Sequence, residues 1–219
     1  MWDSSTINMI LIGLLETIYM TFLSTLLAYV IGLPLGVLLV TSENSGILPM
    51  PKLNQILNAI VNIVRSVPFL ILLIAVIPFT RFVIGTTIGS TATVVPLVIA
   101  AAPFIARIVE SSIKEVDNGV IEAAISMGSS PFQIICKVMI PEAVPSLIIG
   151  GAIATTTILG YSAMAGIVGG GGLGDIAIRF GLYRYQNDIM IVTVILLVLV
   201  VQVAQEIGMK IAKKQDKRK

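Results

Sequence analysis

Histidine is absent from the 219 residues, and Cys136 is the single cysteine. Structural and catalytic zinc sites rely mainly on cysteine and histidine, and Ser-His or Cys-His catalysis needs an imidazole base. The sequence therefore argues against those chemistries, and a lone cysteine excludes a disulfide within the chain. We expect neither a metal ion nor a cofactor on this polypeptide.

Charged residues are also scarce. They make up 12% of the chain, against 56% hydrophobic residues, and the mean hydropathy is +1.00. A soluble globular chain carries about a quarter charged residues. This composition excludes an ordinary soluble enzyme and indicates a membrane protein. The alternating segments of about ten residues that build a membrane barrel are missing too, so the spans should be helical.

Apolar segments of roughly membrane-spanning length are separated by charged residues along the whole chain. We expect an all-α, polytopic membrane protein that forms a single domain over residues 1–219. Its five spans are expected at about residues 9–40, 66–80, 91–109, 144–168 and 189–209. Ahead of the second span, residues 53–64 place aliphatic side chains on one helical face, which predicts an amphipathic approach packed on neighbouring helices.

Lysine and arginine fall unevenly on the two sides of this arrangement. With the N-terminus outside, eleven lie on the inner side: Lys52, Arg65, Arg107, Lys114, Lys137, Lys210, Lys213, Lys214, Lys217, Arg218 and Lys219. Three lie on the outer side: Arg81, Arg179 and Arg184. Because positive residues favour the inner side, we expect the N-terminus outside and the C-terminus inside. The basic tail at 210–219 would anchor the last helix at the anionic inner leaflet.

A polar segment at about residues 114–145 separates the third and fourth spans and is expected on the inner side. Asp117 or Asn118 can cap a short helix that follows them. Ser130 and Gln133 have the spacing of a capping box, with proline at the first helical position, so a second short helix is expected there.

The bend between these two helices should be tight. Gly128 permits a sharp turn that a side chain would obstruct. Ala123 and Ala124 are expected to present a smooth surface that could enter a groove. Pro141 and Pro145 should close the segment before the fourth span. The alternative interpretation is an amphipathic connector that lies at the membrane surface.

Three features of this segment have a characteristic spacing: Glu122-Ala123-Ala124, then Gly128, then Ile140-Pro141. This spacing resembles the loop by which permeases of bacterial ABC importers dock onto their ATPases. Most of the chain is similar to the methionine-type permeases of that family, notably at residues 64–69, 77–81, 101–107 and 160–174. Val138 and Ile140 stand where the family pattern more often has isoleucine and leucine, which preserves an apolar contact.

The resemblance implies a permease subunit of an ATP-driven methionine importer in the bacterial cytoplasmic membrane. It implies a homodimer, two ATP-binding subunits docked on the Glu122 loop, and an external binding protein, often a lipoprotein. Five spans are few for enclosing an amino acid, which also favours a path at a dimer interface. The chain is then no enzyme: no lysine follows a glycine, so it has no Walker A sequence, and partner chains hydrolyse the ATP. No nucleic acid is implied.

Hydroxyl and aromatic side chains gather late in the fourth span. Thr157, Tyr161, Ser162 and Met164 are our candidates for the substrate path. Paired Met164 side chains from two subunits could form a gate, because a thioether is unbranched and adaptable. The alternative is that these threonine-rich faces only let helices pack closely.

Four further features have structural interpretations. The run 169–174 formally matches G-x-G-x-x-G but lacks the βαβ context of a nucleotide site, so an outer turn is expected. Residues 32–36 should form a kink or tight helix crossing. Glu16 is expected to be solvated. Arg107 should pair with Glu110, three residues away.

Alternative functions remain open at this point. An ABC permease could carry another amino acid or a quaternary amine such as choline. An ion-coupled secondary carrier is a second class, but such carriers place an ionisable residue near the bilayer midplane. Midway along the five expected spans there is no aspartate, glutamate or histidine. A passive channel would not explain the Glu122 loop.

Arg65, at the expected inner edge, could reach the lipid headgroups.

Overall fold

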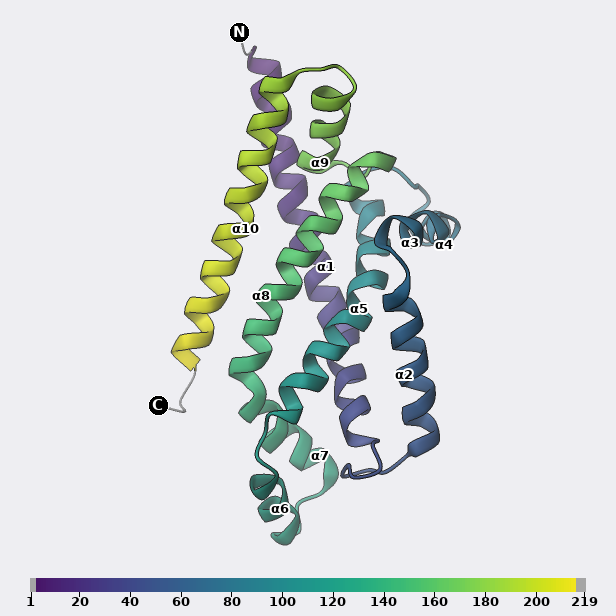
Figure 1. The fold of residues 1–219 in the computed structure, drawn as a ribbon, viewed down its shortest axis with the longest axis vertical. Coiled ribbons are helices and arrows are strands. Elements are labelled where there is room, and N and C mark those ends of the chain that lie inside the picture. Colours follow the sequence, from purple (N-terminus) through teal and green to yellow (C-terminus); the bar gives the residue numbers. More distant parts are fainter. Residues whose placement is uncertain (1–2, 216–219) are drawn as a thin grey trace.

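The computed structural model describes residues 3–215, and within them it contains helices and turns but no strand (Figure 1). The α-helices are α1 (Ser4–Thr41), α2 (Pro51–Ser66), α3 (Phe69–Ala75), α4 (Ile77–Ile84), α5 (Ser90–Lys114), α6 (Asn118–Ser126), α7 (Pro131–Ile134), α8 (Ile140–Ala165), α9 (Gly172–Ile176) and α10 (Asn187–Gln215). Two π-helical turns, Ile135–Met139 and Ala177–Leu182, and one 3-10 turn, Gly166–Val168, complete the helical structure.

Four helical segments in the described chain are long and apolar enough to cross a membrane: α1, α5, the continuous stretch 131–168, and α10. A fifth candidate is the pair formed by α2 and α3, which is bent by 103°. The expected all-α, polytopic fold is therefore confirmed, with four or five candidate spans. Lys217, Arg218 and Lys219 of the basic tail lie outside the described residues.

The second span, expected at 66–80, is not one continuous helix over those residues. Its residues are apolar, but α2 ends at Ser66, and Val67 adopts an extended conformation, as residues before proline usually do. Pro68 then starts α3, and a further break at Val76 separates α3 from α4. In Figure 1, α2 rises along the bundle, whereas α3 and α4 run across it.

The start of the fourth span was also placed wrongly. Pro141 and Pro145 do not end a segment, because helical structure continues through both of them to Ala165. A π-helical turn directly precedes Pro141, and in it the Ile140 amide donates to the carbonyl five residues back, at Ile135. Such turns change the hydrogen-bond register inside a helix, so a continuous helix can accommodate a residue without an N–H.

The tight crossing expected at 32–36 is confirmed. A Cβ added to Gly32 would lie 2.8 Å from the carbonyl oxygen of Ala102, and one added to Gly36 would lie 2.6 Å from that of Ala106. Glycine therefore lets the backbones of α1 and α5 approach closely. This contact fixes α5 against α1 along much of its length.

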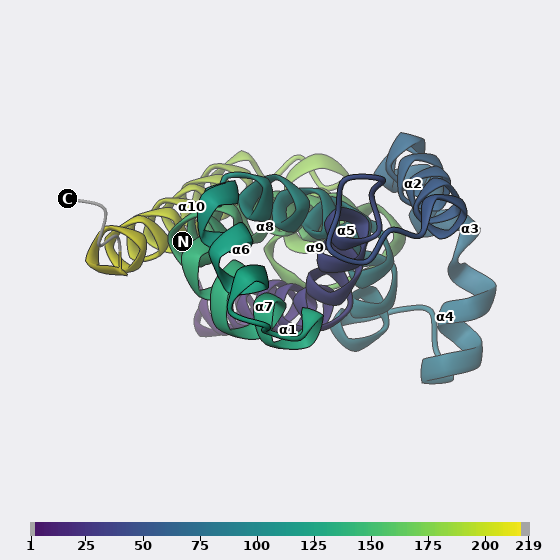
Figure 2. The same ribbon diagram turned by 90° about the horizontal axis from the view of Figure 1, so that it is seen from below.

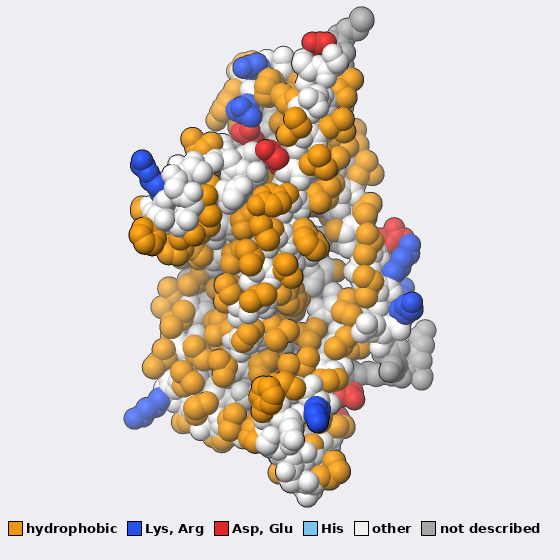
Figure 3. All heavy atoms as spheres, turned by 180° about the vertical axis from the view of Figure 1, so that it is seen from behind, with side chains coloured by type: hydrophobic (Ala, Val, Ile, Leu, Met, Phe, Trp, Pro, Cys, Tyr) orange, Lys and Arg blue, Asp and Glu red, His pale blue; other side chains and the backbone are white. Residues whose placement is uncertain are grey.

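Helix α5 lies at the centre of the bundle and α10 at its edge. In the most apolar window of each helix, 56% of α5 is buried, against 11% of α10. Figure 2, seen along the bundle, shows α10 at one margin and α2 to α4 at the opposite one. Hydrophobic side chains cover the middle of the face in Figure 3, and charged side chains are gathered at its margins. This distribution suits a helix bundle surrounded by lipid.

Candidate functional site

Helices α6 and α7, with the turn between them, form a hairpin that projects from one end of the bundle (Figure 1). Asp117 caps α6, its side chain accepting from the Gly119 amide at 2.6 Å. Ser130 and Gln133 form the expected capping box: the Gln133 side chain accepts from the Ser130 amide at 2.9 Å, and the Ser130 hydroxyl accepts from the Gln133 amide at 3.4 Å. The predicted local structure is confirmed, and both short helices begin with satisfied amides.

The turn of the hairpin depends on the backbone conformation of Gly128. Its φ is +76°, and a Cβ built on it would meet nothing within 4 Å. The Gly128 amide donates to the Ile125 carbonyl at 2.9 Å, and the Ser129 amide donates to the Ala124 carbonyl at 3.1 Å. Glycine is thus required for the left-handed conformation that reverses the chain and not for lack of space.

The exposed face of the hairpin differs from the expected one. Ala124 is only 3% exposed and packs into the core, so our expectation that its side chain presents a contact surface was wrong. Glu122 and Ala123 are exposed. Two large apolar side chains that we did not predict as part of this surface are also exposed at the tip, Met127 at 78% and Phe132 at 74%. The sequence already shows large apolar residues within this polar segment, and such exposed residues often mark a binding surface.

Ile140 and Pro141 lie where this segment joins α8. Ile140 is partly buried against the hydrophobic core, whereas Pro141 is exposed. Helices α6 and α7 therefore present a small, mostly apolar surface that includes the exposed carboxylate of Glu122. No group of three or more residues in the chain from 3 to 215 could hold a metal ion.

An ionic network links the base of the hairpin to the bundle. Arg107 pairs with Glu110 at 2.5 Å, as expected, and its second nitrogen donates to the Asn62 side chain at 2.8 Å. Lys114, the last residue of α5, reaches Glu110 at 2.9 Å and Glu43, just beyond α1, at 2.7 Å. The network ties α5 to α1 and α2 at the point where the chain enters the hairpin, so the hairpin should move with all three helices.

The opposite end of the bundle is closed by contacts from α1 to the glycine run. Our expectation of a solvated Glu16 was wrong: its carboxylate is partly buried and accepts from the Gly172 amide at 2.7 Å. The neighbouring Thr17 hydroxyl, 1% exposed, accepts from the Leu173 amide at 2.8 Å. These two side chains cap the first amides of α9, which no local sequence pattern around Glu16 could reveal.

Two of the candidate path residues lie on the accessible side of α8. Tyr161 stacks on Phe69 of α3, with ring centroids 4.5 Å apart and planes 5° from parallel. Met164 lies one turn further along α8 and is 47% exposed. Stacked aromatic rings hold the bent segment against α8. The exposed thioether is free to contact another molecule.

The other two candidates are turned toward their own helix. Ser162 is 1% exposed, and its hydroxyl donates at 2.8 Å to the backbone carbonyl three residues earlier. The Thr157 hydroxyl donates at 2.9 Å to the carbonyl four residues earlier. Both hydroxyls therefore bond to carbonyls of their own helix. Because Ser162 is also buried, it does not line an open path. Thr157 is a candidate by its position on α8.

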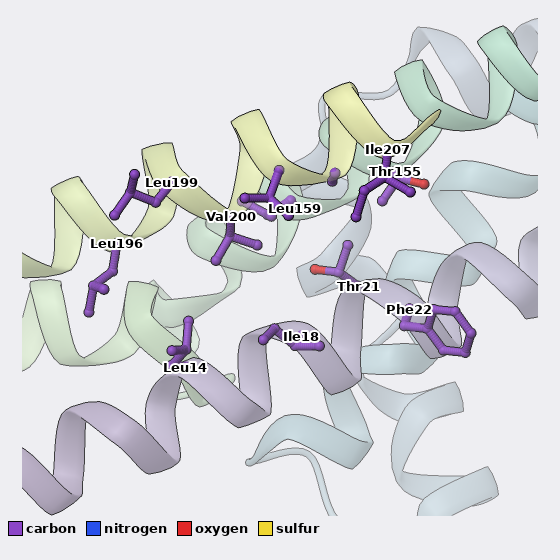
Figure 4. A pocket seen from close by; sticks show the side chains of 12 residues that line it. Leu14, Ile18, Thr21, Phe22, Thr155, Leu159, Leu196, Leu199, Val200 and Ile207 are labelled. Atoms are coloured by element: carbon purple, nitrogen blue, oxygen red, sulfur yellow. The ribbon is translucent and has the colours of Figure 1, made fainter. Parts of the chain in front are cut away.

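An apolar groove between α1, α8 and α10 has a volume of about 470 Å³. Figure 4 shows Leu14, Ile18 and Phe22 of α1 facing Leu196, Leu199 and Val200 of α10. Thr21 and Thr155 are its polar members, and the Thr155 hydroxyl is already bonded to a backbone carbonyl. A charged amino acid needs polar partners when it leaves water, so this groove does not suit one.

An apolar bundle with several candidate spans and an exposed, capped hairpin at one end defines an integral membrane protein. Comparison with known families identifies the family within this class. The chain belongs to the family of binding-protein-dependent transport system inner membrane components, whose family model matches residues 28–208.

Relatives described as D-methionine transport system permeases match most of this chain. A probable D-methionine transport system permease protein MetI from Vibrio cholerae is 48% identical over 217 residues, which are 99% of this chain and 96% of the relative. The D-methionine transport system permease protein MetI of Escherichia coli K12 is 51% identical over 154 residues, 70% of this chain and 71% of that protein.

Solved structures agree with this assignment. A chain of the MetNI methionine ABC transporter in an inward-facing conformation matches with a TM-score of 0.97 and 44% identity, covering 99% of this chain and 100% of that one. An amino acid ABC transporter with histidines matches with a TM-score of 0.77 at 20% identity, covering 98% and 99%, and so shares the fold.

The capping of α9 by α1 yields a stability prediction. Thr17→Val should leave the Leu173 amide buried without its acceptor, which costs about 1–3 kcal/mol of unfolding free energy. Thr25→Val is the matched control, because its hydroxyl bonds only within α1, to the Thr21 carbonyl. Thermal unfolding of the purified protein in detergent should show a lower Tm for Thr17→Val alone. Equal Tm values for the two variants would refute the capping role.

Proposed function

We propose that this chain is the transmembrane permease subunit of an ATP-driven importer whose cargo is methionine. It is a multi-pass protein of the inner membrane and works as a homodimer. Separate ATP-binding subunits supply the energy, and an external binding protein delivers the cargo. The permease itself catalyses no reaction, so its contribution is to form the path and to change which side the path opens to.

The observation that carries this proposal is the match to the MetNI methionine transporter along the entire chain, at a TM-score of 0.97. A 48% identical relative described as a methionine permease, equal in length to within a few per cent, supports the same cargo. A second observation is the shape of the subunit. Its bent segment α2–α3 and the accessible side of α8 are open to one side, as expected if a second copy completes the path.

We propose further that the N-terminus lies outside the cell and that the α6–α7 hairpin lies in the cytoplasm. The hairpin end of the bundle carries Lys52, Lys114 and Lys137, and the opposite end carries Arg179 and Arg184. Positively charged residues favour the inner side. Lys213 and Lys214 at the end of α10 fit the same orientation and can interact with anionic headgroups.

In this orientation the hairpin is the docking element for the ATP-binding subunits. Glu122 and Ala123 lie on its exposed side, and the exposed Met127 and Phe132 add the apolar area that a stable contact needs. Ala124 and the Gly128 turn support the hairpin from within. When two ATPase subunits close on ATP, they draw the two hairpins together, and the ionic network at the base transmits the movement to α1, α2 and α5.

The path then runs between the two subunits, past Tyr161 and Met164 on α8. Met164 of one subunit can meet its counterpart near the symmetry axis and close the path as an apolar gate. A flexible thioether can pack tightly in one state and yield in the other. Thr157 lies nearly two turns before Met164 on the same helix, toward the cytoplasmic side.

An ion-coupled carrier is a poorer account of the same structure. Two carboxylates are buried in the described chain, and each is paired with a cation: Glu110 with Arg107 and Lys114, and Asp175 with Arg179. A carrier driven by protons would need an ionisable group free to load and release its proton. A permease for another amino acid or a quaternary amine shares the fold, but the whole-chain likeness favours methionine.

The proposed function predicts uptake that depends on every partner. Liposomes containing the permease with its ATP-binding subunits, ATP and the binding protein should accumulate radiolabelled methionine. Omitting either ATP or the ATP-binding subunits should abolish accumulation, and choline or histidine should not compete. Uptake by the permease alone, driven by an ion gradient, would contradict the proposal.

The hairpin turn predicts a specific loss of coupling. Gly128→Val forces a β-branched residue into the left-handed region, at a cost of about 1–2 kcal/mol. The complex should lose its ATPase subunits during purification, or lose uptake, while the permease still inserts in the membrane. Gly128→Asn is the control, because asparagine tolerates this conformation and should retain coupling. Normal co-purification and uptake with Gly128→Val would defeat the docking role.

The gate predicts a change in accessibility at position 164. In a Cys136→Ser background, a Met164→Cys thiol should react with a water-soluble reagent in one nucleotide state and resist it in the other. The comparison uses the nucleotide-free complex and the complex held with a non-hydrolysable ATP analogue. A thiol that is inaccessible in both states would show that position 164 faces lipid or packed protein, and the gate assignment would be wrong.

A further inference from the structure

A second cavity, distinct from the apolar groove, lies at the bend between α2 and α3. Its volume is about 260 Å³. It is lined by Val64, Arg65, Val67, Phe69, Leu72, Ala100, Phe104 and Tyr161. Ala100 and Phe104 lie near the middle of α5, so the cavity opens beside the middle turns of that helix.

Arg65 is the charged residue of this cavity. It is 14 residues beyond the start of α2, or about 21 Å along the helix axis. The start of α2 is tied to the end of α1, where the Asn54 side chain donates to the Leu39 carbonyl at 2.7 Å. Arg65 lies one turn beyond Asn62, whose side chain accepts from Arg107, so it stands beside the ionic network of α5. Charged residues within membrane-spanning segments often mark functional sites.

The two arginines on this side of the bundle have different surroundings. Arg107 forms an ion pair with Glu110 and donates a hydrogen bond to the Asn62 side chain. Asn62 lies one turn before Arg65 on α2. Arg65 is exposed to the cavity side and forms no ion pair with any of the residues from 3 to 215. A guanidinium offers five donors in a rigid fork that matches a carboxylate. Within the described residues, the Arg65 guanidinium at this cavity therefore has no counter-ion.

The rest of the cavity offers an apolar wall. Phe69 and Tyr161 are stacked and form one side, and Phe104 and Leu72 extend it. A thioether makes favourable contacts with aromatic rings. The break at Pro68 also leaves carbonyls of the last turn of α2 without helical donors, and these can accept from an ammonium group. Pockets for drug-sized ligands measure about 300–1,000 Å³, and an amino acid is smaller.

We propose that this cavity is a transient binding subsite for the carried amino acid within the membrane. Arg65 receives the α-carboxylate, and the wall of Phe69, Tyr161 and Phe104 contacts the side chain. The inference rests on the proposed import of an amino acid and adds a selection step inside the permease. Arg65 then rejects cargo that lacks a carboxylate, a role independent of the gate at Met164.

Protection of a reporter thiol tests this subsite directly. Ala100→Cys in a Cys136→Ser background places a small thiol in the cavity wall, and labelling is followed in the detergent-purified, nucleotide-free complex with its ATP-binding subunits. Methionine should slow labelling, whereas methioninamide, which lacks the carboxylate, should not. Arg65→Gln should raise the methionine concentration for half-protection at least about tenfold, and Arg65→Lys should raise it less.

Arg81→Gln is the matched control, since Arg81 is exposed on α4 and does not line the cavity. It should leave protection unchanged. Equal protection with Arg65 and with Arg65→Gln, equal protection by the amide, or no protection at all would each overturn the subsite. Methionine uptake by the parent complex is measured in parallel. If uptake fails there, the proposed function is wrong, whereas normal uptake without Arg65-dependent protection removes only the subsite.

Discussion

The close approach of α1 and α5 holds the rest of the molecule in position. Gly32 and Gly36 bring the two backbones together, and larger residues there would collide with main-chain carbonyls that cannot move aside. From this contact the bundle extends in both directions. At one end α1 caps α9 through Glu16 and Thr17, and at the other Glu43 reaches Lys114. The close α1–α5 crossing and the polar contacts at the two ends of α1 therefore hold together helices that are far apart in the sequence.

In the proposed transporter, this arrangement lets a small hairpin act on the path through the membrane. The hairpin leaves α5 at Lys114 and returns into α8 through a continuous helix. A force on α6 and α7 therefore acts on two long helices at once. α5 carries the ionic network that also holds α2, while α8 carries Tyr161 and Met164. The bent segment α2–α3 packs on α8 through the stacking of Phe69 on Tyr161, so in the proposed transporter it would move together with α8.

Much of this organisation follows from local sequence rules. Scarce charge and long apolar segments predict the helical membrane class, and the capping residues Asp117 and Ser130 predict the starts of α6 and α7. Other features depend on contacts between distant residues. Nothing near Glu16 indicates that Gly172, 156 residues later, needs an acceptor. Apolar composition alone could not distinguish a straight second span from one broken at Pro68, because both bury similar side chains in lipid. Ala124 illustrates the same limit, since a loop pattern does not tell which face packs inward.

In the proposed transport cycle, closure of the ATP-binding subunits moves the two hairpins of the dimer toward each other. The most direct measurement is the distance between spin labels on Ser126→Cys, in a Cys136→Ser background, within the assembled transporter. Ser126 is exposed on α6, and its variant must first retain methionine uptake. The account predicts a shorter label-to-label distance with a non-hydrolysable ATP analogue than without nucleotide. An unchanged distance in a transporter that still imports methionine with ATP would contradict it.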